Sequence, residues 1–482
     1  MRLIRRVVRW CLGPGPAALG LLGQTLTGWA LAGQARAQEP EPEPGWLHPL
    51  AQQPFGAWRS MTFPSAANGA PWDFAAQPLT LVRWWTTGCP FCRDSLPALA
   101  QLEATHRARG LRLLPVFHPK GVRPDDAALA EYLRELGVQG PFAVDADWSV
   151  LQDILQRGEL TSATSISVLV DRHGRIRWVH PGPRLCDDPE HPEARAALAE
   201  LDDLLDRLLP RADAPPVELT VMGFNVRYGT ADDGDDAWPR RKALLLETIT
   251  RDLPDVLATQ ELLPEQGEAI ERELDAALAG EGSGYVRVGR SRSARDDDEQ
   301  CAILLRENRL EVRDRGHFML SATPDAHGSA DPDAALPRLC TWVRASDRRN
   351  GRELLLASTH FDHRGAAARR RAWGVLQREL GRHARGAPIV LLGDFNVDLD
   401  ADAARERAPR AACLDGLGLV DAFAGRDVGG TFHGFRGEPG AARIDGVFAH
   451  RDLEVRDAGL DRHHDGARWP SDHFPVRARL RW

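Results

Sequence analysis

Short apolar runs alternate with amphipathic segments along most of this chain, and one proline-rich segment, Pro210 to Pro216, divides the pattern into two blocks. Prolines stop a helix and stiffen the chain, so we interpret residues 211–216 as a linker. The 482 residues also exceed the roughly 250–300 residues that one hydrophobic core usually organises. We therefore predict two α/β domains, at residues 50–210 and 217–482.

The first 37 residues have the order of features found in a secretory signal peptide. Four arginines come first, an apolar stretch from Trp10 to Ala32 follows, and the small-x-small triplet Ala35-Arg36-Ala37 ends the segment. Prolines and glycines interrupt the apolar stretch, which argues against a permanent membrane anchor. We predict that residues 1–37 are removed and that the protein is periplasmic or secreted, without stable membrane insertion. Residues 38–49, rich in Glu and Pro at their start, should be extended.

The net charge bears on which ligands the protein attracts, and the cysteine content bears on whether it forms disulfides. The formal net charge is −8, and residues 1–37 contain five arginines and no acidic residue, so the mature chain is more acidic still. Such a charge does not steer polyanions such as duplex DNA toward the protein. Seven cysteines occur, and an exported location permits disulfides. Cys301 and Cys340 both lie in strand-like runs, and one alternative is that they pair across neighbouring strands.

The first block contains a pair of cysteines at the start of a predicted helix. Leu79 to Trp85 is an apolar run typical of a buried strand, and the helix predicted at 92–109 follows it. The partial positive charge of a helix N-terminus favours a thiolate on Cys89, and the two intervening residues allow Cys92 to close a disulfide with it. We predict a redox-active dithiol. Half of a zinc site and a purely structural disulfide are the alternatives.

The order of elements in this block carries a first resemblance. Further strands are expected at 111–117, 166–170 and 176–179, and further helices at 125–136, 148–156 and 193–209. With the dithiol, this order resembles the thioredoxin-like fold, especially exported thiol-disulfide oxidoreductases of the TlpA kind, over roughly residues 50–210. The resemblance implies exchange with a disulfide-bearing protein partner. Ser165 departs from the pattern, because it stands where that family has a cis-proline facing the dithiol.

In the second block, polar side chains stand where short apolar runs begin or end. They are Asp394 and Asn396 after residues 389–392, His360 after residues 354–357, Asp445 before residues 447–448, and Asp472 and His473 before residues 474–476. Ends of buried strands that open into loops carry functional groups in many folds. Carboxylates, an amide and histidines gathered there predict a metal site that cleaves phosphoesters.

Seven fragments of this block resemble the endonuclease/exonuclease/phosphatase superfamily, over about residues 217–482. The resemblance implies a four-layer α/β sandwich for the second domain. The fragments are residues 222–228, 259–261, 337–342, 358–362, 393–396, 443–445 and 471–473.

The same resemblance implies a divalent metal ion. A hard cation such as Mg²⁺ or Mn²⁺ needs oxygen ligands, and Glu261 ends the apolar run 256–258 at the rim where the other fragments gather. Asn225 and Asp472 are implied to lie in the same metal neighbourhood.

The remaining roles concern the attack of water on phosphorus. We expect His473 to take the proton from the attacking water, and the resemblance implies that Asp445 fixes its tautomer. Asp394 would position the water, Asn396 would donate to a phosphoryl oxygen, and His360 would stabilise charge developing at phosphorus. The predicted substrate contacts are Arg338, Arg227 and Tyr228.

We therefore predict an exported, metal-dependent phosphoesterase with an appended thioredoxin-like dithiol domain. Its substrate is a phosphodiester or phosphomonoester, with nucleic acid included in that class. The alternative is a thiol-disulfide oxidoreductase whose C-terminal domain is a non-catalytic ligand-binding module.

Overall fold

The computed structural model describes residues 44–56, 60–64, 72–160, 165–210, 216–293, 295–401 and 404–482. The predicted signal peptide, nearly all of the predicted linker and residues 38–43 lie outside these ranges. Within them, no helix combines the length and the apolar character needed to cross a membrane. The Gly45 backbone N–H donates a hydrogen bond of 2.8 Å to Glu200 Oε1, so the first domain begins before the predicted boundary at residue 50.

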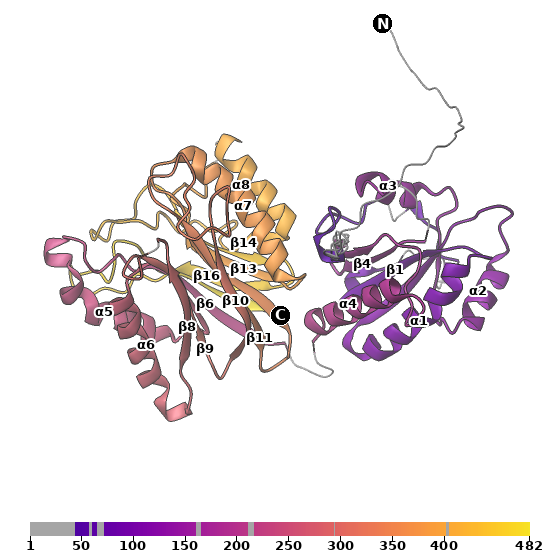
Figure 1. The fold of residues 1–482 in the computed structure, drawn as a ribbon. Coiled ribbons are helices and arrows are strands. Elements are labelled where there is room, and N and C mark those ends of the chain that lie inside the picture. Colours follow the sequence, from indigo (N-terminus) through magenta and orange to yellow (C-terminus); the bar gives the residue numbers. More distant parts are fainter. Residues whose placement is uncertain are drawn as a thin grey trace, which may run out of the picture. The chain divides into compact units, whose positions relative to one another are not determined.

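The first domain is built on a five-stranded sheet with the order β3-β2-β1-β4-β5 (Figure 1). Its strands are β1 Leu79–Trp85, β2 Leu111–Phe117, β3 Ala143–Val144, β4 Ser167–Asp171 and β5 Ile176–His180. The central strand β1 runs parallel to β2 and antiparallel to β4. Every residue of β1 is buried, because helices cover both faces of the sheet.

Alternate residues of β1 contact two separate cores. The helices are α1 Pro90–His106, α2 Asp126–Glu135, α3 Ser149–Arg157 and α4 Pro192–Leu208. Leu81 packs with α1 and α4, whereas Val82 packs with α3 on the other face. Cys89 is the N-cap of α1, and Pro90 occupies the first helical position, where a missing N–H leaves no bond unmade.

Among the described residues, the second domain contains two six-stranded sheets. One has the order β10-β11-β12-β13-β15-β14 and the other β16-β17-β6-β7-β9-β8. The strands are β6 Glu218–Asn225, β7 Val256–Leu262, β8 Tyr285–Ser291, β9 Gln300–Arg306, β10 Leu310–Met319, β11 Leu339–Asp347, β12 Glu353–His360, β13 Ile389–Asp394, β14 Leu419–Asp421, β15 Asp445–His450, β16 Glu454–Leu460 and β17 Val476–Arg481.

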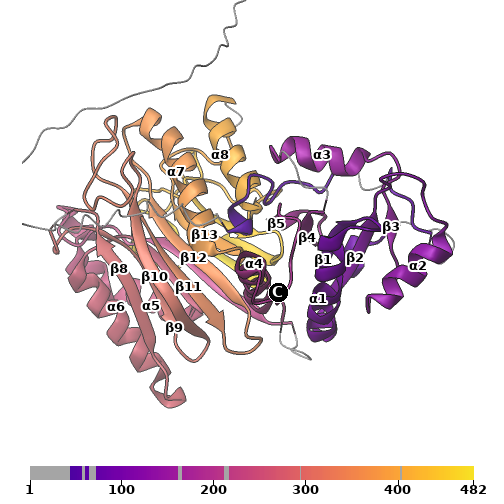
Figure 2. The same cartoon turned by 45° about the vertical axis from the view of Figure 1, so that its right-hand side comes forward.

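The two sheets pack face to face, and a pair of helices covers the outer face of each (Figures 1 and 2). The helices are α5 Trp238–Asp252, α6 Pro264–Leu278, α7 Ala366–Ala384 and α8 Ala404–Leu417. Val221 and Val390 meet in the core between the sheets. Their neighbours Met222 and Leu391 point outward, toward α5 and α6 and toward α7 and α8 respectively. The predicted four-layer α/β sandwich is therefore confirmed.

The suggested pairing of Cys301 with Cys340 is wrong. Cys301 lies in β9 and Cys340 in β11, which belong to different sheets, and both are free thiols. Strand-like character at both positions was correctly inferred, but it does not say which strands are neighbours. Cys89, Cys92, Cys186 and Cys413 are also free thiols.

The aromatic cluster beneath α7 provides a test of the fold. Trp373 is 1% exposed and stacks on Phe395, with ring centroids 5.0 Å apart. We expect Trp373→Ala to lower the free energy of unfolding by about 3–5 kcal/mol, because it leaves a large cavity in the core. Urea unfolding measures this, with Val420→Ala as control, since Val420 is 39% exposed in β14. A loss no larger than that of the control would contradict the packing described.

Candidate active site

Three adjacent strands of one sheet place His360, Asp394 and Asp445 side by side. His360 ends β12 and pairs in register with Asp394, which ends β13. Asp394 pairs in turn with Asp445, which begins β15. All three side chains are buried, so the strand ends gather two carboxylates and an imidazole at one edge of the sheet.

The facing sheet contributes an amide and a further carboxylate to the same place. Asn225 ends β6, and its Nδ2 donates to Glu261 Oε1 at 3.1 Å and to Asp394 Oδ2 at 3.0 Å. Asn225 thus connects the two sheets directly. Glu261 has a φ of +58° near the end of β7, a left-handed conformation that costs energy for a residue other than glycine. Asn396 has the same kind of backbone, with a φ of +49°.

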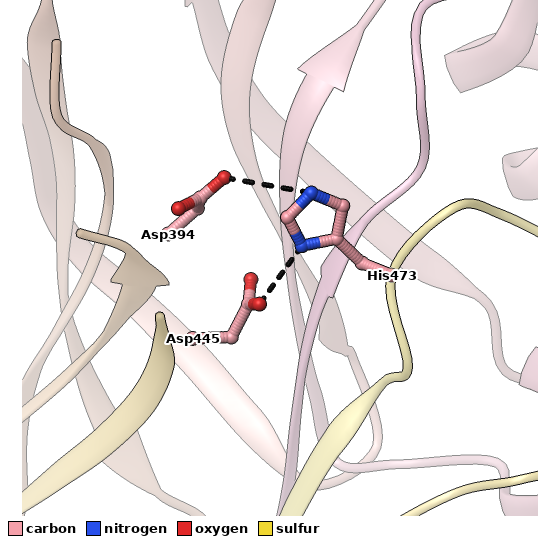
Figure 3. A group of neighbouring side chains, drawn as sticks. All are labelled: Asp394, Asp445 and His473. Atoms are coloured by element: carbon pink, nitrogen blue, oxygen red, sulfur yellow. Dashed lines mark hydrogen bonds and ion pairs between the residues drawn. The ribbon is translucent and has the colours of Figure 1, made fainter. Parts of the chain in front are cut away.

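His473 lies between two carboxylates (Figure 3). Its Nδ1 is 2.8 Å from Asp445 Oδ2, and its Nε2 is 3.8 Å from Asp394 Oδ2. Among the described residues, Asp394, Asp445 and His473 form a group whose ligand atoms lie within 4.8 Å of one another, close enough to hold a metal ion. The predicted base, the residue predicted to fix its tautomer and the predicted water-positioning residue therefore meet at one point.

Burial and charge shift the titration of this group. Burial, and after it the charge of Asp445, raises the pKa of Asp394 to about 7. Burial alone would lower the pKa of His473, but the charge and hydrogen bond of Asp445 raise it well above its usual value. Without a bound cation, the excess of carboxylates therefore favours a protonated imidazole.

His360 and Asn396 lie on the other side of Asp394. Asn396 Nδ2 is 3.0 Å from His360 Nε2, and the latter is 3.4 Å from Asp394 Oδ2. Burial, followed by the nearby charge of Arg338, lowers the pKa of His360 well below its usual value. Because the Asn396 amide donates to Nε2, the proton of the neutral ring lies on Nδ1.

Asp472 and the three predicted substrate contacts each have different neighbours. Asp472 Oδ2 is 3.8 Å from Arg227 Nε, but Arg227 is mainly engaged by Asp233, at 2.7 Å. The backbone N–H of Tyr228 donates a hydrogen bond of 3.3 Å to Glu261 Oε2. Arg338 lines a cavity beside the site together with Glu261 and His360.

Some residues at the site gave no signal in the sequence. Arg292 and Glu299 line the same cavity as Arg338. Phe432 is 45% exposed, and its ring centroid lies 5.1 Å from that of His473. Thr431 Oγ1 accepts hydrogen bonds from the backbone N–H groups of residues 444 and 445 and so fixes the start of β15. Arg292 directly follows β8 and Glu299 directly precedes β9, whereas Thr431 and Phe432 lie in a loop. Only the fold brings them together here.

A second candidate site lies in the first domain. Cys89 is partly exposed and Cys92 is buried, and Ser165 Oγ is 3.6 Å from Cys89 Sγ and 3.3 Å from Cys92 Sγ. Burial alone would raise the pKa of Cys89, but hydrogen bonds with Cys92 and Ser165 and the charge of Arg83 lower it. Burial raises the pKa of Cys92. Cys89 is therefore the accessible, more acidic thiol of the pair.

Comparison with known families agrees with both resemblances. The endonuclease/exonuclease/phosphatase family model matches residues 222–473, which is more than half of the chain. The chain belongs to this family. Its members hydrolyse phosphoesters. A redoxin family model matches residues 66–198, in agreement with the thioredoxin-like fold of the first domain.

Solved structures similar to this endonuclease/exonuclease/phosphatase family member align with its second domain. A family protein from Bacteroides thetaiotaomicron is 29% identical with a TM-score of 0.50, and the match covers 56% of this chain and 97% of that one. A mannosyl-6-phosphatase from the same organism is 30% identical with a TM-score of 0.48, covering 54% and 99%. The human nocturnin catalytic domain is 20% identical with a TM-score of 0.43, covering 56% and 96%. No curated protein matches the chain.

The contact between His473 and Asp445 predicts the effect of removing one charge. Asp445→Asn keeps the shape of the side chain but loses the charge that holds and stabilises the His473 imidazolium, so kcat should fall by about 100-fold or more. Hydrolysis of an aryl phosphoester measures this. Asp457→Asn, at an exposed position in β16, is the control and should leave kcat unchanged. Equal rates for the two variants would contradict the role of Asp445.

Proposed function

We propose that this protein is an exported phosphoesterase that depends on Mg²⁺ or Mn²⁺. The observation that supports this most strongly is the meeting of Asp394, Asp445 and His473 within 4.8 Å, with Asn225 connecting them to Glu261. The arginine-rich, apolar N-terminal segment supports export. The substrate is a phosphomonoester or phosphodiester, and the acidity of the mature chain argues against long nucleic acid.

The chemistry of the donor set fits a hard divalent cation. Glu261, Asn225 and Asp472 offer oxygen atoms, and no thiol is among them. The carboxylates Asp394 and Asp445 lie in the same buried region, so the site concentrates negative charge that a dication would offset. When bound, the ion would supply charge stabilisation to the phosphoryl and leaving oxygens.

The chain's own residues supply the proton transfer and the orientation of substrate. His473 would accept a proton from water as a neutral imidazole, and a bound cation would supply the positive charge that offsets the carboxylates favouring its protonated form. Asp445, 2.8 Å from Nδ1, holds the ring so that Nε2 faces the reacting water. Asp394, 3.8 Å from Nε2, positions that water. His360 and Asn396 donate to the phosphoryl oxygens as the water attacks in line.

The central test is hydrolysis of artificial aryl phosphodiester and phosphomonoester substrates. We expect His473→Ala and Glu261→Ala each to lower kcat by about 100-fold or more, because one removes the base and the other a metal ligand. His464→Ala is the matched control, since His464 lies in an exposed loop. Full activity in both site variants would overturn the proposed hydrolase.

Metal removal gives an independent test. Chelation should abolish hydrolysis, and either Mg²⁺ or Mn²⁺ should restore it, because the proposed ligands are oxygen atoms. Glu261→Ala should raise the metal concentration needed for half-maximal activity. Undiminished turnover in the chelated protein would contradict metal dependence.

The second candidate function is thiol-disulfide exchange, with the C-terminal domain as a non-catalytic ligand-binding module. The accessible Cys89 beside the buried Cys92 favours exchange, and a disulfide-bearing protein is the proposed partner. Insulin reduction with dithiothreitol as electron donor should be accelerated by the wild type and not by Cys89→Ser. Because hydrolysis is measured separately, the two assays show whether the chain has one activity or both.

A further inference from the structure

A fully buried arginine lies on the central strand of the first domain. Arg83, in β1, donates from Nη1 to Ser167 Oγ at 3.1 Å and from Nη2 to Ser95 Oγ at 3.1 Å and to the Pro183 carbonyl at 2.6 Å. Among the described residues no carboxylate forms an ion pair with it, and its Nε has no hydrogen-bond partner. A buried cation without a counter-ion is costly to fold around.

The dithiol lies on the same side of β1 as this guanidinium. Arg83 shares its face with Leu81, which packs in the core that includes Cys92. Ser95, which Arg83 contacts, comes three residues after Cys92 on α1 and so lies one turn along the same helix face. Ser165, which contacts both sulfurs, comes two residues before Ser167, which contacts Arg83.

Within the part of the chain that the structure describes, the charge of Arg83 is opposed by the two cysteines of the dithiol. Burial lowers the pKa of Arg83 to about 10, and the groups that oppose that shift are Cys92 and Cys89. His180, on β5, is kept neutral, since burial and then Arg83 lower its pKa to about 4. The thiols of the dithiol are therefore the groups that can supply the missing negative charge.

We propose that Arg83 is the counter-ion of the reduced dithiol, and that the first domain consequently acts as an oxidant of thiols. A cation near the sulfurs stabilises a thiolate but has no favourable interaction with a neutral disulfide. It therefore shifts the equilibrium toward the reduced form, which raises the reduction potential of the Cys89–Cys92 couple. This inference rests on the proposed thiol-disulfide exchange activity. It adds that exchange runs in the direction of substrate oxidation and that Arg83 determines this direction.

The exchange balances in two steps. A thiolate of a dithiol substrate attacks Cys89 Sγ, the accessible sulfur of the disulfide; the Cys89–Cys92 bond breaks, and Cys92 leaves as a thiolate stabilised by Arg83. The second substrate thiolate attacks the substrate's own sulfur in the mixed disulfide, and Cys89 leaves as a thiolate. Two electrons pass from the substrate dithiol to the protein, and the substrate becomes a disulfide. Cys92 then takes a proton from solvent.

The first experiment measures the redox equilibrium of the full-length mature protein with reduced and oxidised glutathione. We expect Arg83→Met to lower the equilibrium constant for reduction of the disulfide at least tenfold, equivalent to about 30 mV for two electrons. Arg83→Lys, which keeps the charge, should recover most of this loss. Arg134→Met is the control, because Arg134 is an exposed residue of α2, and it should behave as wild type. An equilibrium constant unchanged in Arg83→Met would overturn the proposal.

The second experiment needs no substitution and so holds even if a variant folds poorly. By thermodynamic linkage, stabilisation of the reduced form in the folded state makes the reduced wild-type protein more resistant to urea than the oxidised protein. The reverse order would overturn the proposal that the first domain acts as an oxidant of thiols. If glutathione never forms a disulfide with Cys89, the exchange activity itself fails. If exchange proceeds but the oxidised protein is the more stable, only its proposed direction fails.

Discussion

The site of the second domain depends on burying several carboxylates at the edge where two sheets meet. Asn225 makes this possible, since its amide donates to Glu261 on its own sheet and to Asp394 on the facing sheet. The remaining negative charge raises the pKa of His473, although burial alone would lower it, and a cation would offset that charge. The same excess of charge therefore explains both the fit to a divalent ion and the placement of a histidine that can exchange a proton.

Much of the fold and the centre of the site were predictable, because the end of a buried strand is visible in the sequence as an apolar run next to polar residues. The apolar run that predicts β1 coincides with Leu79–Trp85, and the polar residues that end β12 and β13, His360 and Asp394, do meet. Such predictions succeed where the residues adjacent in sequence determine whether a side chain stands at the end of a strand. Which strands lie side by side is not local information, and the pairing suggested for Cys301 and Cys340 failed for that reason.

Other features could be recognised only in three dimensions. Arg83 is a single charged residue in an apolar run, and the sequence does not say whether its guanidinium reaches solvent or stays under the dithiol. Arg292 and Phe432 lie in loops whose path depends on the packing of both sheets. Conversely, Arg227 was a reasonable substrate contact from its motif, but Asp233 occupies its guanidinium.

We propose that Glu261, Asn225 and Asp472 hold one divalent ion next to His473. Anomalous scattering from a crystal grown with Mn²⁺ locates such an ion directly. The expected result is a peak coordinated by the Glu261 carboxylate, with Asp394 and His473 beside it. A well-occupied Mn²⁺ bound elsewhere, with no peak at Glu261, would contradict it.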